Sequence, residues 1–224
     1  QRDIYCDPNR TLLLRGNSFE LIKLIPDRSV KLFLIDPLYG ILNKAKFGWD
    51  VAWQPNELFA LLDQIFHKKL ATGGRLVLFG KGKFYMDMLQ IVHEFTDKHG
   101  ISGQQLIWSH RGRTNRPNDH QEVSSFENIG VYSRIHEKKH LILPERYAYS
   151  DLIEIPKDNS AIPCFKPPQL ISYLLNRYTS EGDLCVDPTL FKGCTAYACK
   201  KMNRKCIGFE QDKNNFKEAC RNIL

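Results

Sequence analysis

Asp36, Asp187 and Glu210 each follow directly on a short apolar run, and acids in such places could bind or polarise a ligand. The runs that precede them are residues 30–35, 183–186 and 205–209. Near-continuous apolar runs of this kind are typical of strands that are buried on both faces of a parallel sheet. Because ligands of such sheets bind beyond the carboxyl ends of the strands, we predict that the three acids line one cleft.

The first acid begins the segment Asp36-Pro37-Leu38-Tyr39-Gly40. The exocyclic amine of a nucleobase is a poor nucleophile because its lone pair is delocalised into the ring. The carboxylate of Asp36 and the carbonyl of Pro37 would localise that lone pair by accepting the two amine hydrogens. Tyr39 would stack on the base once the base has left its duplex. Taken alone, an Asp-Pro after a strand is more often only a turn.

A second group of residues has the arrangement of a nucleotide-cofactor site. Lys166 and Pro167 precede an expected helix, and Gly193 lies between the strand that ends at Asp187 and the next helix. A glycine turn at such a place lets a cofactor approach the backbone at a helix N-terminus. Glu210 ends the following strand, 23 residues after Asp187, which is close to the spacing of about 20 at which an acid binds ribose hydroxyls.

Strand and helix patterns alternate along the chain. The expected strands are 10–15, 30–35, 75–79, 105–108, 127–133, 183–186 and 205–209, and the expected helices are 55–66, 83–95, 167–178 and 193–202. Such alternation predicts an α/β domain with a doubly wound, mostly parallel sheet. Asn17 is expected to cap a short helix, with Glu20 reaching back to complete a capping box.

The bulk composition is that of an ordinary globular protein, 42% hydrophobic and 25% charged over 224 residues. We expect a single domain over 1–224, in which the weakly periodic residues 134–165 form a small specificity segment. The net charge of +7 fits a phosphate-rich partner such as a nucleic acid, although a merely basic protein fits it equally well.

Cysteine spacing and the lack of long apolar segments indicate the kind of cellular compartment in which the protein is expected to work. The 7 cysteines include no C-x-x-C pair, so we expect small buried side chains, no disulfides and no metal site. No segment approaches the ~20 apolar residues of a membrane span, and no signal peptide is visible. These features predict an intracellular protein of a reducing compartment, the cytoplasm or a nucleus, that does not bind membranes.

Taken in order, these motifs resemble the DNA amino-methyltransferases, which modify the amino group of adenine (N6) or cytosine (N4). Asp36-Pro37-Leu38-Tyr39 resembles the Asp-Pro-Pro-Tyr catalytic tetrad of that family, and Lys166-Pro167 with Leu170 resembles its Lys-Pro-x-x-Leu segment. Residues 182–195 resemble its cofactor loop, and 206–210 resemble the strand whose acidic end holds the ribose. Because the catalytic motif comes first, the resemblance implies a circularly permuted, Rossmann-like fold of the class I methyltransferase type.

The resemblance also implies a cofactor, a substrate and roles for individual residues. The cofactor is S-adenosylmethionine and the substrate is DNA, with adenine favoured because the tetrad begins with Asp. The expected catalytic residues are Asp36, Pro37 and Tyr39. The residues expected to bind the cofactor are Asn17, Lys166, Asp187, Thr189, Gly193 and Glu210.

Three positions depart from the family pattern: Leu38 replaces the second proline, Thr189 replaces a phenylalanine and Phe191 stands where the family has glycine. If position 191 requires a positive φ, a phenylalanine there is strained by about 1 kcal/mol or more. Its ring would also reach the space of the cofactor's methionine. Two functions therefore remain open: an active methyltransferase, or a non-catalytic relative that binds DNA or an active partner. A methyltransferase that acts on RNA or protein is a third alternative, which the DNA-type motif order disfavours.

Two basic loops are the expected DNA contacts. The cations expected to bind phosphates are Lys44 and Lys46 in residues 41–54, and Arg111, Arg113 and Arg116 in residues 110–120. His110 and His120 are expected to be polar surface residues, because the proposed chemistry needs no histidine. Trp53 is expected to anchor its loop rather than to stack on a base. A second methyltransferase-like subunit or a homodimer is a further candidate partner.

Overall fold

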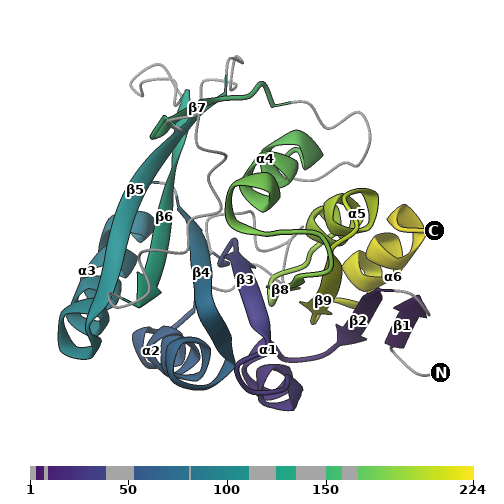
Figure 1. Ribbon diagram of the computed structural model, residues 1–224, viewed down its shortest axis with the longest axis horizontal. Helices are drawn as coiled ribbons and strands as arrows, with labels where there is room; N and C mark the ends of the chain where they lie inside the picture. Colours follow the sequence, from purple (N-terminus) through teal and green to yellow (C-terminus); the bar gives the residue numbers. More distant parts are fainter. Residues whose placement is uncertain are drawn as a thin grey trace.

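One sheet forms the centre of the molecule, and the computed structural model describes residues 4–7, 10–38, 53–80, 82–110, 125–134, 150–157 and 166–224. Over these ranges nine strands pair in the order β1-β2-β9-β8-β3-β4-β6-β5-β7 (Figure 1). The strands are β1 (Ile4–Asp7), β2 (Thr11–Arg15), β3 (Val30–Ile35), β4 (Leu70–Gly80), β5 (Ile101–Ser109), β6 (Phe126–Arg134), β7 (Leu152–Glu154), β8 (Leu184–Asp187) and β9 (Lys205–Glu210).

Strand direction agrees with the expected, mostly parallel sheet. The neighbours β2, β9, β8, β3 and β4 are all parallel. β1 is antiparallel to β2, and β6 is antiparallel to both β4 and β5. The middle of the sheet therefore holds β8 and β9, from the end of the chain, between β2 and β3, from its beginning. This is the circularly permuted order that the motifs predict.

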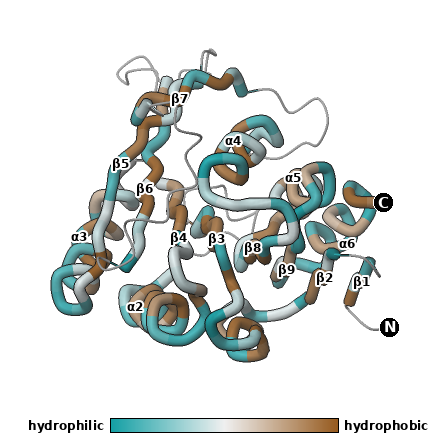
Figure 2. The backbone as a smooth tube through the Cα atoms, viewed as in Figure 1, coloured by the Kyte–Doolittle hydropathy of each residue, from teal (hydrophilic) through white to brown (hydrophobic). Residues whose placement is uncertain are grey.

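Helices cover both faces of the sheet (Figure 1). On one face lie α1 (Ser18–Leu21) with the short turn η1 (Ile22–Leu24), α2 (Pro55–Asp63) with the wider turn η2 (Gln64–Lys69), and α3 (Gly82–His99). On the other face lie α4 (Pro168–Tyr178), α5 (Cys194–Lys201) and α6 (Lys213–Asn222). Along α3 the colour changes between hydrophobic and hydrophilic, as in a helix that buries one stripe and exposes the other (Figure 2).

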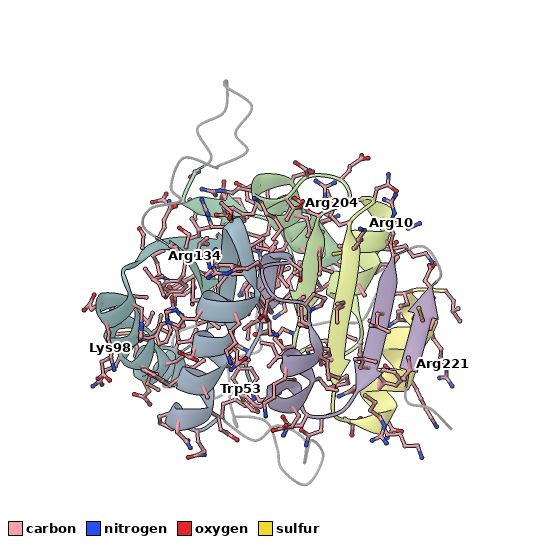
Figure 3. All side chains as sticks on the ribbon, turned by 60° about the horizontal axis from the view of Figure 1, so that its bottom comes forward. Arg10, Trp53, Lys98, Arg134, Arg204 and Arg221 are labelled. Carbon is pink, nitrogen blue, oxygen red and sulfur yellow. The ribbon has the colours of Figure 1, made fainter. Side chains whose placement is uncertain are left out.

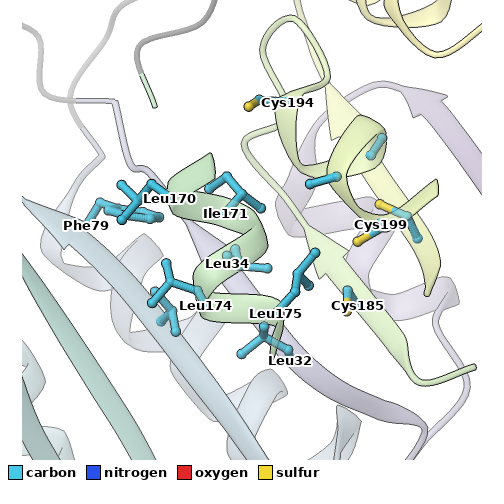
Figure 4. Close-up of a cluster of buried hydrophobic side chains, with 14 of the residues drawn as sticks. Leu32, Leu34, Phe79, Leu170, Ile171, Leu174, Leu175, Cys185, Cys194 and Cys199 are labelled. Carbon is cyan, nitrogen blue, oxygen red and sulfur yellow. The ribbon is translucent and has the colours of Figure 1, made fainter. Parts of the chain in front are cut away.

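Alternation along the strands divides the core into two layers. In β3, Leu32 and Leu34 belong to the layer under α4–α6, whereas Phe33 and Ile35 belong to the layer under α1–α3. Figure 4 shows the first layer, where the leucines of α4, such as Leu174, pack above β3. The same alternation therefore decides on which face of the sheet a side chain just beyond the end of β3 lies.

The free cysteines largely follow the prediction of small buried side chains. Cys185, Cys194, Cys199 and Cys206 are buried, but Cys6 is exposed on the edge strand β1. The buried thiols fill space between β8, β9 and α5, where a larger side chain would not fit at native packing density. None of the helices in the described part of the chain combines the length and hydropathy that a membrane crossing requires.

Some predictions of local structure need correction. The side chain of Asn17 caps α1 by accepting a hydrogen bond from the Phe19 backbone at 2.8 Å, as expected. Glu20 does not complete a capping box; it forms an ion pair with Lys23 at 2.8 Å. The short strands β1 and β7 escaped prediction, because runs of 4 and 3 residues carry too little periodicity to be recognised.

Several predicted functional residues lie outside the described ranges. They are Tyr39, Lys44, Lys46, Arg111, Arg113, Arg116 and His120, together with residues 135–149 and 158–165 of the expected specificity segment.

Two glycines offer a matched test of the packing between α5 and α6. Gly193 and Gly182 both have a left-handed backbone, with φ of 87° and 81°. A Cβ at Gly193 would lie 3.1 Å from the Cα of Ala219 in α6, whereas a Cβ at Gly182 would meet nothing within 4 Å. We expect Gly182→Ala to lower the free energy of unfolding by about 1 kcal/mol, from backbone strain alone. Gly193→Ala should lower it by roughly 2–4 kcal/mol, because overpacking is added. Urea denaturation measures both, and equal losses would contradict the close approach of α6.

Candidate active site

The carboxyl ends of β3, β8 and β9 place the three acids of the sequence prediction at one edge of the sheet. The backbone N–H of Asp36 donates to Thr189 Oγ1 at 2.9 Å. The Thr189 N–H and hydroxyl both donate to Asp187 Oδ1, at 2.8 and 3.1 Å. Thr189 therefore ties the end of β3 to the end of β8, and the predicted convergence is present in the fold.

Asp187 and Glu210 are less acidic than ordinary carboxyl groups. Burial raises the pKa of Asp187 to about 6, although hydrogen bonds from the Thr195 and Thr189 side chains and the Thr189 backbone act in the opposite direction. Burial likewise raises the pKa of Glu210 to about 7, against hydrogen bonds from the backbones of Asp212 and Phe191. Both carboxylates are held mainly by neutral donors, so their negative charge has little compensation within the protein.

The loop between β8 and α5 keeps the backbone shape that a glycine would give it. Phe191 has a φ of 49°, in the left-handed region, so the condition attached to the strain prediction is met. This conformation directs the Phe191 N–H toward the carboxylate of Glu210. Lys192 fixes the next position through an ion pair with Glu218 at 2.8 Å. The strain of about 1 kcal/mol or more is thus part of a loop that is anchored on both sides.

Asn17 lies near the end of β9, close to Glu210. It follows Gly16, whose N–H donates to the carbonyl of Glu210 at 3.0 Å. The hydroxyl of Ser18 donates to the carbonyl of Pro188 in the cofactor loop. The N-terminus of α1 is therefore joined to the ends of β8 and β9, which brings Asn17 to the same sheet edge as Asp187 and Glu210.

Lys166 contacts Asp36, the first of the three acids. Its ammonium lies 2.7 Å from Asp36 Oδ2 and 3.0 Å from Glu127 Oε2. The side chains of Lys166 and Glu127 are 9% and 5% exposed, whereas Asp36 is 25% exposed. Burial alone would lower the pKa of Lys166, but the two carboxylates raise it above its ordinary value. Lys166 therefore brings a buried positive charge into direct contact with the carboxylate of Asp36.

Glu127 was not among the predicted site residues, and the prediction for His110 was wrong. His110 is only 1% exposed, and its ring packs against Trp108 with centroids 5.1 Å apart. Its Nε2 lies 3.9 Å from Glu127 Oε1, and Lys157 Nζ lies 3.7 Å from the same oxygen. His110 is buried because β5, which it follows, packs against the layer under α4. A charged residue at the start of the apolar run 127–133 was the one signal in the sequence.

Pro37 faces the opposite layer. It lines a cavity of ≈ 200 Å³ together with Trp53, Leu58 and Met88, between the end of β3 and the helices α2 and α3. Trp53 is labelled in Figure 3. Its ring packs edge-on against Phe19, with ring centroids 5.2 Å apart, which agrees with its expected anchoring role. The Asp-Pro pair thus joins the two faces of the sheet, with the carboxylate toward α4 and the proline ring toward α2.

The arrangement matches a known family. A model of that family, described as DNA methylase, matches residues 30–221. The chain belongs to the DNA methylase family. The Type II methyltransferase M.HhaII of Haemophilus parahaemolyticus is 28% identical over 220 residues, covering 88% of this chain and 91% of that protein. Neither match gives support to a non-catalytic relative, the alternative that the sequence had left open.

Solved structures share the fold of this DNA methylase. The M1.HpyAVI–SAM complex has a TM-score of 0.71 at 19% identity, covering 95% of this chain and 98% of that one. The cytosine-N4-specific PvuII DNA methyltransferase has a TM-score of 0.75 at 17% identity, covering 96% and 86%. A putative DNA modification methylase from Thermus thermophilus, complexed with S-adenosylmethionine, has a TM-score of 0.70 at 18% identity, covering 94% and 93%. The predicted class I methyltransferase fold is confirmed, and S-adenosylmethionine is the cofactor that membership of the family implies.

Removal of the buried ammonium should destabilise the methylase. Lys166→Met leaves Asp36 and Glu127 without their shared cation, and we expect a loss of roughly 3 kcal/mol of unfolding free energy at pH 7. Because the pKa of Lys166 is raised in the folded state, its contribution is complete below about pH 10.4, the ordinary lysine value, and disappears as the pH rises through the folded-state value.

The matched control for this prediction is Lys23→Met. Lys23 forms an ion pair of similar length with Glu20, 2.8 Å, but both side chains are exposed. We expect a loss of about 0.5 kcal/mol or less. Urea denaturation of both variants tests the difference, and similar losses at the two lysines would show that the buried ion group does not stabilise the fold.

Proposed function

We propose that this DNA methylase transfers the methyl group of S-adenosylmethionine to the exocyclic amine of an extruded DNA base, with adenine as its target. The observation that carries the proposal is the hydrogen-bonded connection from Asp36 through Thr189 to Asp187. It joins the expected amine-binding motif to the expected cofactor loop in one place. Adenine is preferred because the tetrad begins with Asp36.

The residues at this edge fit the cofactor. Among the described residues, the carboxylate of Glu210 receives its hydrogen bonds from the backbones of Asp212 and Phe191. Ribose hydroxyls are donors of the kind that such a carboxylate accepts. Gly193 precedes α5 in a left-handed conformation, and the positive end of that helix suits the carboxylate of an amino acid. Asp187 is 6% exposed, so its role is to hold Thr189 and the loop rather than to meet the ligand directly. When bound, S-adenosylmethionine supplies an electrophilic methyl group.

The catalytic half of the site acts on the amine. Asp36 accepts one hydrogen of the amine and the carbonyl of Pro37 accepts the other, so the nitrogen lone pair is directed toward the methyl group. The nitrogen becomes positive as the new bond forms, and the carboxylate of Asp36 stabilises that charge. The nitrogen then loses one proton to water, which leaves the neutral methylated amine. Lys166 keeps Asp36 in place through the 2.7 Å ion pair. Positioning and a preorganised charge, rather than a general base, supply the rate in this scheme.

Other parts of the proposal concern residues outside the described ranges. Tyr39 is proposed to stack on the extruded base. The cations proposed to bind phosphates are Lys44, Lys46, Arg111, Arg113 and Arg116. The buried free thiols of Cys185, Cys199 and Cys206 support the further proposal that the protein works in a reducing compartment.

Methyl incorporation into duplex DNA tests the activity. Asp36→Asn keeps the size of the side chain but removes its charge, and we expect kcat to fall roughly 100-fold or more, as when one preorganised group is lost from a transition state. Calorimetry should show unchanged affinity for S-adenosylmethionine. Asp97→Asn, an exposed acid on α3, is the control and should keep the wild-type rate.

Nuclease digestion of the product then distinguishes N6-methyladenine from N4-methylcytosine. Absence of label in wild-type reactions on mixed-sequence DNA would contradict the activity, and N4-methylcytosine alone would contradict the target.

Cofactor affinity should depend on pH through Glu210. Because its pKa is raised from 4.5 to about 7 and ribose hydroxyls favour the ionised form, affinity should fall as the pH drops through 7, by up to about tenfold per unit below it. The sign is opposite for stability: between about pH 4.5 and 7 the folded protein holds a proton that the unfolded chain releases, so this group's contribution decreases as the pH rises.

The control for the pH dependence is Glu210→Gln. The amino group of S-adenosylmethionine titrates near pH 8 in both proteins, so the difference between them isolates Glu210. Calorimetry between pH 5.5 and 8 measures it. A slope that is the same in the variant would exclude Glu210 as the ribose acceptor.

A further inference from the structure

Strand direction brings Glu127 to the catalytic edge. The parallel strands end at this edge, whereas β6 runs antiparallel to β4 and β5 and therefore begins there. Glu127 is the second residue of β6 and shares a face with Ile129 and Val131, in the layer under α4. Asp36 follows Leu34 of the same layer by two residues, which places its carboxylate on the same face. The two acids thus meet from opposite strand directions.

Lys166 lies between the two acids. It immediately precedes Pro167, the N-cap of α4, and its Nζ is 2.7 Å from Asp36 and 3.0 Å from Glu127. Its position is fixed at both ends: its carbonyl accepts a hydrogen bond from the Cys194 thiol at 3.0 Å, and its ammonium is 5.1 Å from the centre of the Phe79 ring. The ammonium is therefore held in place, shared by two carboxylates.

The net charge of this group decides how Asp36 can act. Asp36 with Lys166 alone is a neutral pair, and the positive charge that develops on the amine would meet no net negative charge. With Glu127 included, the group carries a net charge of −1. Lys157 and His110 also face Glu127, at 3.7 and 3.9 Å. Lys157 is 31% exposed, so water screens its charge more than that of Lys166.

We propose that Glu127 is a positioning residue for methyl transfer. It holds the ammonium of Lys166 and balances its charge, so that the ion group around Asp36 presents a net negative charge to the amine. This inference rests on the proposed function of the site. It assigns to Glu127, which lies on a strand outside both the tetrad and the cofactor loop, an effect on the rate of the chemical step and not on cofactor binding.

Three single variants test the proposal in the methyl-incorporation assay. Glu127→Gln keeps the shape but removes the charge, and we expect kcat to fall on the order of ten- to a hundredfold, with the affinity for S-adenosylmethionine unchanged within about twofold. Glu127→Asp keeps the charge on a shorter side chain and should retain more of the rate than Glu127→Gln. Glu94→Gln, an exposed acid on α3, should match the wild type. A merely structural role would lower stability and cofactor affinity without this division between kcat and binding.

A double variant makes the test sharper. Glu127→Gln should lower kcat because the charge of the Lys166 ammonium is no longer balanced. Adding Lys166→Met removes that ammonium, so the double variant should have a kcat equal to or above that of Glu127→Gln, although Lys166→Met alone lowers kcat. Thermal unfolding of each variant checks that the protein is folded; if Glu127→Gln does not fold, Glu127→Asp and the double variant carry the comparison. An active wild type with an equally active Glu127→Gln would overturn the role of Glu127 alone. A wild type that incorporates no label would overturn both this inference and the proposed function.

Discussion

Parallel pairing of β3, β8 and β9 is the constraint on which the site depends. Strands that run in one direction end at one edge of the sheet, so acids at the ends of three adjacent strands must be neighbours. A shift of one residue in register would turn each side chain to the other face, and the buried layers above and below β3 prevent it. The hydrogen bonds of Thr189 to Asp36 and Asp187 are possible only because that register is fixed.

The two halves of the site treat charge differently. Asp36 has a buried ammonium beside it, and Glu127 balances that ammonium in turn. Within the described ranges, the donors to Asp187 and Glu210 are neutral, and burial raises the pKa of both carboxyl groups. Of the two, Asp187 holds Thr189 and the loop, whereas the uncompensated carboxylate of Glu210 suits a ligand that brings hydroxyl donors, as S-adenosylmethionine does. A compensated carboxylate suits a neutral amine that becomes positive only during the reaction.

The loop between β8 and α5 holds a phenylalanine in a backbone conformation that favours glycine. Phe191 occupies a left-handed position that glycine fills without strain. Its N–H still reaches Glu210, and the ion pair of Lys192 with Glu218 holds the loop against α6. The cost of the phenylalanine is local, about 1 kcal/mol.

The sequence by itself determined most of the strands and their acidic ends, because apolar runs and their spacing are local properties of the chain. The permuted order followed from the resemblance of the motifs to those of the DNA amino-methyltransferases. The sequence also indicated Asp36, Asp187 and Glu210 as neighbours, since parallel strands share an edge. Only the tertiary structure decided that β6 runs the other way and so brings Glu127 to that edge, with His110 buried beside it. Strand direction and the partner of Lys166 depend on contacts between residues far apart in the chain, and no local pattern encodes such contacts.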